Sequence, residues 1–91
     1  MSKQRVPTSL RESIQEIHER MSSRTAILHY LRDIPPERRG GDHCIFVQRL
    51  DRELKELQIH LWVVLNDWRD GRLSAAIAAN LLRMPFADIR N

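Results

Sequence analysis

The chain has 91 residues, 15 basic and 12 acidic side chains, a formal net charge of +3 and one cysteine, Cys44. This length fits one domain with a modest core, and a lone cysteine excludes a disulfide within the chain and favours a reduced cytosolic thiol. No stretch resembles a signal peptide and no apolar run is long enough to span a bilayer, so we expect a cytoplasmic protein without a membrane partner.

The first helix is predicted over residues 9–34, after a polar and flexible arm at residues 1–8. Proline disfavours helical backbone in the residue before it, so Pro35 and Pro36 end this helix. The apolar residues of the segment recur at close to heptad spacing and form one stripe: Leu10, Ile14, Ile17, Met21, Leu28 and Leu31.

Two local features concern the start of this helix and its continuity. Ser9 and Glu12 have the spacing of a capping box, which predicts a side-chain cap at its start. Arg24 falls where the stripe requires an apolar residue, directly after Ser22 and Ser23. We therefore expect the helix to bend or restart near Arg24.

A loop at residues 35–42 and a long second helix at residues 43–70 follow. Gly40 and Gly41 permit a sharp reversal, Asp42 is a plausible N-cap, and Gly71 supplies a stop. The second helix carries the strongest periodic signal of the chain: Val47, Leu50, Leu54, Leu57, Leu61, Val64 and Trp68. A short loop makes the two helices antiparallel neighbours.

The second half of this helix carries an additional apolar face formed by Ile59, Trp62, Val63 and Leu65. A helix that is apolar nearly all round must be covered on more than one side, and the first helix covers one side only. Three occupants of the extra face are open: the C-terminal segment, a second copy of the chain, or a foreign partner. Burial of Trp62 under the C-terminal helix is the first of these expectations.

A third, short helix is predicted over residues 74–83, with Ser74 as its cap. Its apolar residues suit docking onto the extra face: Ile77, Leu81 and Leu82. Met84 and Pro85 break it, and a further helical turn is predicted at residues 86–90.

The spacing of Ala78, Ala79, Leu81, Leu82, Met84, Pro85 and Ile89 resembles the first helix and turn of helix-turn-helix DNA-binding proteins, over residues 73–91. The resemblance implies DNA contacts through Arg83, Phe86 and Arg90. Two departures concern the turn and the reading helix: Arg83 stands where the family has glycine, and the reading helix has room for about six residues where the motif needs more. A short alanine-rich helix that closes a bundle is the structural alternative.

Residues for metal or catalytic chemistry are scattered. His18, His29, His43 and His60 have unrelated spacings, and His43 and Cys44 point about 100° apart on a helix. No glycine-rich phosphate loop is present. We therefore expect no metal, no cofactor and no enzymatic activity.

These observations predict an all-α fold: a long antiparallel helical hairpin with a short C-terminal helix, forming a helical bundle as a homodimer. We expect a small non-enzymatic regulator or adaptor that binds a protein partner, of the inhibitor or anti-activator type found in bacteria and phages. Its alternatives are a DNA-binding transcriptional regulator and a structural subunit of a larger assembly. The predicted interface comprises Leu54, Leu57, Ile59, Trp62, Leu65, Arg38 and Arg39.

Overall fold

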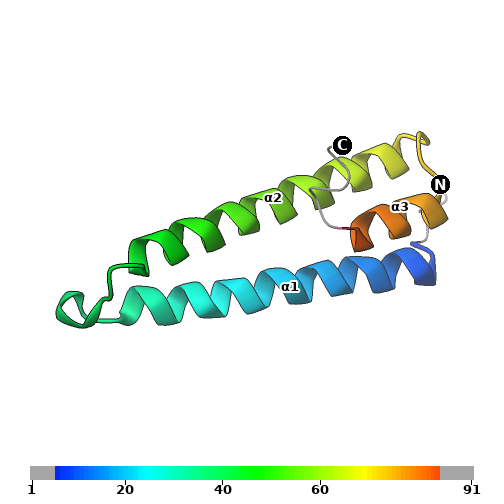
Figure 1. Ribbon diagram of the computed structural model, residues 1–91. Coiled ribbons are helices and arrows are strands. Elements are labelled where there is room, and N and C mark those ends of the chain that lie inside the picture. The colour runs from blue at the N-terminus through cyan, green and yellow to red at the C-terminus, as the bar shows by residue number, and fades with distance from the viewer. Residues whose placement is uncertain (1–5, 85–91) are drawn as a thin grey trace.

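The computed structural model describes residues 6–84, and this part of the chain is helical without a strand (Figure 1). Helix α1 runs over Thr8–Asp33, α2 over His43–Arg69 and α3 over Ala75–Arg83, with a short 3-10 turn at Pro36–Arg38. The predicted all-helical fold, with two long helices and a short one, is confirmed. No described helix has both the length and the apolar character that a membrane span requires. The turn predicted at residues 86–90 lies outside the described residues.

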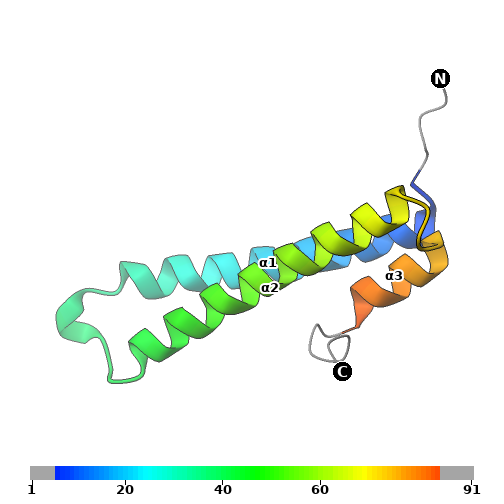
Figure 2. The same cartoon turned by 90° about the horizontal axis from the view of Figure 1, so that it is seen from above.

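Helices α1 and α2 form an antiparallel hairpin, and α3 turns back from the end of α2 to lie against both of them (Figures 1 and 2). The molecule extends 57 Å along its longest axis and 18 Å along its shortest. Because α3 is short, the molecule is three helices thick at the end remote from the loop and two helices thick near the loop.

The core lies at the three-helix end. Its buried members come from all three helices: Leu10, Ile17, Val64, Ala78, Ala79 and Leu82. The small alanines let the backbone of α3 approach the hairpin closely. Near the loop, where α1 and α2 have only each other to pack against, Leu28 is buried but the stripe residues of α2, such as Leu50 and Leu54, stay half-exposed. Burial is thus concentrated where α3 supplies a third layer.

The turn between α2 and α3 uses the two residues predicted for it, Gly71 as the helix stop and Ser74 as the next cap. Gly71 adopts φ of 81°, a left-handed conformation that glycine accepts without strain. This turn lets the N–H of Arg72 donate to the carbonyl of Asp67 at 2.8 Å and the N–H of Gly71 donate to that of Trp68 at 3.1 Å. At the start of α3 the Ser74 hydroxyl accepts from the N–H of Ile77 at 3.2 Å, so this predicted cap is confirmed.

The other two predicted side-chain caps are wrong. Helix α1 begins at Thr8 with Pro7 at the N-cap, and no side chain caps it, because the proline ring has no hydrogen-bond acceptor. The Pro7 carbonyl accepts from Arg11 N–H at 2.9 Å. Asp42 occupies the N-cap of α2, but its backbone is helical, with φ of −90° and ψ of −2°. A capping side chain needs extended backbone, so the Asp42 carboxylate makes no cap bond.

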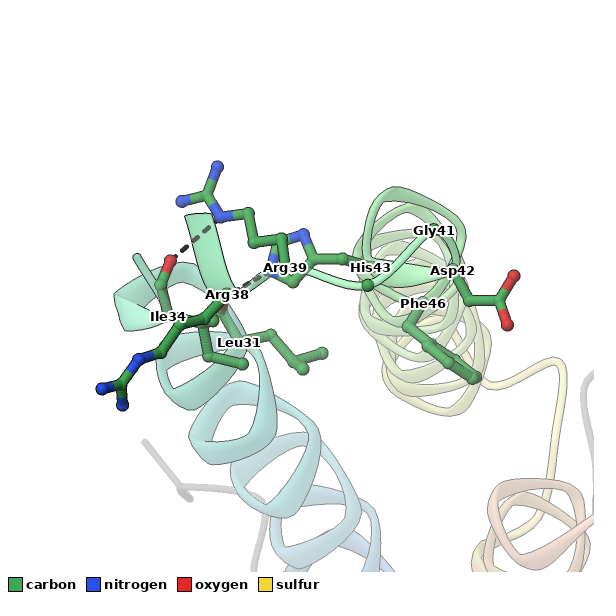
Figure 3. Close-up of a pocket in the computed structure, with 9 residues that line it drawn as sticks. Leu31, Ile34, Arg38, Arg39, Gly41, Asp42, His43 and Phe46 are labelled. Atoms are coloured by element: carbon green, nitrogen blue, oxygen red, sulfur yellow. Dashed lines mark hydrogen bonds between the residues drawn. The ribbon is translucent and has the colours of Figure 1, made fainter. Parts of the chain in front are cut away.

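The reversal between α1 and α2 does not use the glycines as the sequence suggested, since neither Gly40 nor Gly41 has positive φ. Two side chains, one from the loop and one from the start of α2, bond carbonyls at the end of α1 instead (Figure 3). Arg39 Nε donates to the carbonyl of Ile34 at 2.9 Å, and His43 Nε2 lies 2.5 Å from the carbonyl of Leu31. These cationic or N–H-bearing groups satisfy carbonyls that the end of a helix leaves free.

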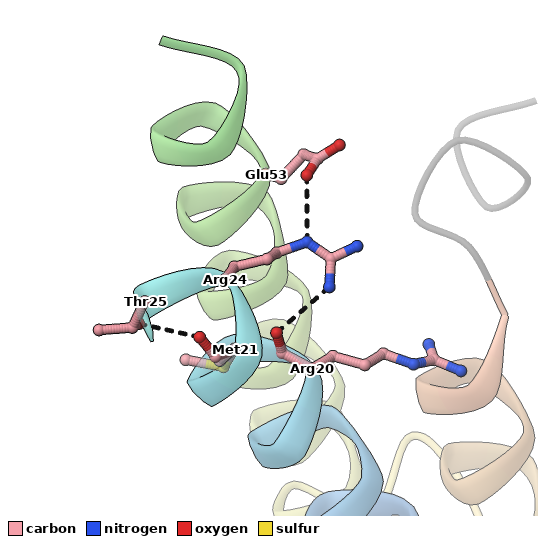
Figure 4. A network of polar contacts seen from close by, with 5 residues as sticks. All are labelled: Arg20, Met21, Arg24, Thr25 and Glu53. Atoms are coloured by element: carbon pink, nitrogen blue, oxygen red, sulfur yellow. Dashed lines mark hydrogen bonds and ion pairs between the residues drawn. The ribbon is translucent and has the colours of Figure 1, made fainter. Parts of the chain in front are cut away.

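The helix does not restart near Arg24, because α1 is uninterrupted from Thr8 to Asp33. The Arg24 side chain reaches out of the apolar stripe toward α2, where its Nε lies 3.1 Å from Glu53 Oε2 (Figure 4). Its Nη1 donates to the carbonyl of Arg20, one turn back, at 3.2 Å. A long side chain that reaches partly solvated partners at the edge of the interface lets the helix continue past a polar residue.

Candidate protein interaction surface

One face of α2 exposes a contiguous group of large apolar side chains. Ile59, Trp62 and Val63 are 55%, 69% and 43% exposed. Spacings of three and four residues place them on one side of the helix. We call these three residues the outer face of α2. An exposed tryptophan flanked by β-branched residues has the composition of a protein contact site.

The outer face is uncovered because α3 docks on a different side of α2. His60 and Val64 are 3% and 4% exposed, and His60 Nε2 lies 2.7 Å from the carbonyl of Leu81 in α3. Each stands two residues from Trp62 in sequence, hence about 160° from it around the helix at about 100° per residue. The expectation that the C-terminal helix α3 buries Trp62 is therefore wrong.

The remaining predicted interface residues do not join the outer face. Leu57 and Leu65 pack against the core cluster, and Leu54 is half-buried in the stripe that faces α1. Arg38 and Arg39 lie in the loop, about 28 Å from Trp62 along α2 at about 1.5 Å per residue. The structure thus divides the predicted interface into a helix face, a core edge and a distant loop.

A pocket of about 240 Å³ opens at the loop, between the end of α1 and the start of α2 (Figure 3). Its apolar walls come from Leu31, Ile34 and Phe46, and Arg38 lies at its rim. The pocket is open to solvent, and the Arg39 and His43 groups in its lining already bond the last carbonyls of α1. These two side chains therefore join the loop and the start of α2 to the end of α1.

The residues that the helix-turn-helix resemblance singled out are only partly described. Arg83 ends α3 and turns toward α1, where its guanidinium lies 3.4 Å from Glu16 and 3.9 Å from Glu12. Phe86 and Arg90 lie outside the described residues. Arg83 thus fastens α3 to α1 in this structure.

Two histidines carry a role that sequence reasoning missed. His43 and His60 both stand on α2, and each bonds a carbonyl in the last turn of another helix, α1 and α3 respectively. Because a carbonyl can only accept, each ring must carry its hydrogen on Nε2. No local sequence signal marks these bonds, since the partners are 12 and 21 residues away. Within residues 6–84, no three or more His, Cys, Asp or Glu side chains form a group that could hold a metal ion.

No protein-family model matches this chain, and no match is found among the curated proteins or among the solved structures.

Proposed function

We propose that this protein is a small non-enzymatic regulator or adaptor in the cytoplasm, which acts by binding protein through the outer face of α2. The observation that carries the proposal is the exposure of Trp62, at 69%, between Ile59 and Val63. Tryptophan is enriched among the residues that dominate interface energies, because it buries a large area with few rotatable bonds.

The surroundings of the outer face fit this role. The face is flanked by charged and polar side chains, among them Arg52, Lys55 and Asn66. An apolar centre with a polar rim is the usual anatomy of a protein interface. The homodimer expected from the heptad-spaced stripes forms part of this proposal, because a second copy is one protein that such a face can bind.

Affinity capture with the tagged chain tests the proposal, using wild type, Trp62→Glu and the matched control Tyr30→Glu. Tyr30 is a comparably exposed aromatic residue, at 65%, but it lies on α1. We expect Trp62→Glu to reduce recovery of the partner by roughly tenfold or more, as for a hot-spot residue, and Tyr30→Glu to leave recovery unchanged.

Each capture is run with and without nuclease. A partner that survives nuclease and depends on Trp62 supports the proposal. Recovery that disappears with nuclease would favour the DNA-binding alternative, and equal recovery by wild type and Trp62→Glu would overturn the role of the outer face.

A further inference from the structure

Helix α3 covers only part of one side of the hairpin. Residues seven apart lie nearly in line along a helix, and two such lines run along this side: Ser13, Arg20, Ile27 and Ile34 on α1, and His60, Glu53 and Phe46 on α2. At the end remote from the loop α3 lies over both lines, where Ser13 and His60 are 0% and 3% exposed and His60 bonds the carbonyl of Leu81. Nearer the loop the same lines reach the surface, since Ile27 and Phe46 are each 49% exposed.

The part of this side beyond α3 carries four apolar residues, which we call the distal strip: Ile27, Leu31, Ile34 and Phe46. The last three line the pocket at the loop (Figure 3), and Ile27 lies two turns before Ile34 on the same line of α1. The distal strip is separate from the outer face of α2, because Phe46 is in line with His60, on the side of α2 away from Trp62. Near the loop the hairpin thus lacks the third layer that α3 supplies at its other end.

The chain leaves α3 in the direction of the distal strip. Helix α3 runs back from the end of α2 toward the loop (Figures 1 and 2), and its Leu81 lies level with His60. His60 and Phe46 are about 21 Å apart along α2, and the residues from Leu81 to Met84 cover about 5 Å of that length, at about 1.5 Å per residue. The remaining distance of about 16 Å is within reach of residues 85–91, which span up to about 24 Å when extended at about 3.4 Å per residue.

Residues 85–91 have apolar side chains suited to a third layer. Phe86 and Ile89 are three residues apart, so a helical turn presents both of them on one side. We infer that residues 85–91 dock on the distal strip, where Phe86 and Ile89 cover Ile27 and the residues beside it. The chain's own segment is favoured over a separate partner, because a short tether gives it an effective concentration in the millimolar range.

This inference concerns a surface other than the outer face of α2, and it does not rest on the proposed function. It gives Phe86 a place within the molecule, whereas the helix-turn-helix resemblance assigns Phe86 to DNA. The two roles exclude each other, because a side chain packed against Ile27 is withdrawn from any base edge.

A thiol-protection experiment on the full chain tests the docking. In a Cys44→Ser background, Ile27→Cys places a thiol on the distal strip, and His29→Cys places a control thiol on the opposite side of α1. Adding Phe86→Glu should raise the rate at which a maleimide labels the first thiol severalfold, because a charged side chain undocks the segment, and it should leave the second rate unchanged. Equal rates with and without Phe86→Glu at both positions would overturn the inference.

A crosslinking experiment checks which chain supplies the segment. With Ile27→Cys and Phe86→Cys together in the Cys44→Ser background, a short bis-maleimide should give a monomer-length product whose yield is independent of protein concentration. The control pair Ile59→Cys and Phe86→Cys, with its first thiol on the outer face of α2, should give much less of this product. Equal yields from the two pairs, or a dimer-length product that grows with concentration, would overturn docking within the chain, and either result leaves the proposed role of Trp62 untouched.

Discussion

Arg24 and Glu53 form an ion pair across the hairpin, with Nε and Oε2 3.1 Å apart, at the position where the stripe of α1 lacks an apolar residue. Their side chains are 32% and 38% exposed, so the pair is partly solvated. It lies on the two-helix part of the molecule, beyond the end of α3 (Figure 4). We expect this contact to favour one lengthwise register of α1 on α2, a role that polar residues play in helical pairs.

We expect Arg24→Ala and Glu53→Ala each to lower the free energy of unfolding by about 0.5–1 kcal/mol, because a pair this exposed is screened by solvent. Arg24→Leu continues the apolar stripe and should leave stability unchanged or raise it by up to about 1 kcal/mol. Urea unfolding followed by circular dichroism measures all three variants. A loss of more than roughly 2 kcal/mol in Arg24→Leu would show that the ion pair is a dominant stabilising contact.

The left-handed backbone at the end of α2 makes Gly71 sensitive to substitution. A side chain at φ of 81° costs about 1–2 kcal/mol, so Gly71→Ala should lower the free energy of unfolding by that amount. Gly40→Ala is the matched control, since Gly40 has no positive φ and a Cβ there meets nothing within 4 Å. We expect the control to be neutral or slightly stabilising. Equal losses in the two variants, measured by thermal unfolding, would contradict this account.

The sequence predicted the helices well, because their signals are local. The stripe of α2, the stop at Gly71 and the cap at Ser74 depend on residues within a few positions of one another. The prediction of a capping box at Ser9 and Glu12 also failed for a local reason, since the N-cap is Pro7, two residues before Ser9. Residue spacing alone does not show whether Pro7 or Ser9 will be the N-cap of this helix.

The candidate site was predicted only in part, because the side of α2 on which α3 docks depends on residues that are far apart in sequence. The sequence identified Ile59 and Trp62 as part of an extra apolar face, but it did not show that α3 would dock on a different side of α2, against His60 and Val64. The contacts that hold α3 on that side join residues far apart in sequence: Leu82 packs into the core cluster, and His60 bonds the carbonyl of Leu81.

Arg83 should contribute modestly to the docking of α3 onto α1. Its ion pairs with Glu16 and Glu12 are 3.4 and 3.9 Å long and exposed, so we expect Arg83→Ala to destabilise α3 by less than about 1 kcal/mol, and less at high salt. Hydrogen exchange of the α3 amides measures this directly. Arg11→Ala is the control, since Arg11 is exposed and has no ion pair within residues 6–84. An equal increase of exchange in both variants would contradict the specific role of Arg83.

His60 should hold α3 more strongly than Arg83 does, because its bond to the carbonyl of Leu81 is buried. His60→Leu introduces an apolar side chain of similar size and removes the Nε2–H donor, so we expect the free energy of unfolding to fall by about 1–2 kcal/mol. The loss should be confined to the three-helix end: amides of α3 should exchange faster, while those around Leu28 keep their protection. His29→Leu, at an exposed position of α1, should change neither. Faster exchange at Leu28 and in α3 alike would mean that His60 stabilises the whole hairpin rather than the docking of its third helix.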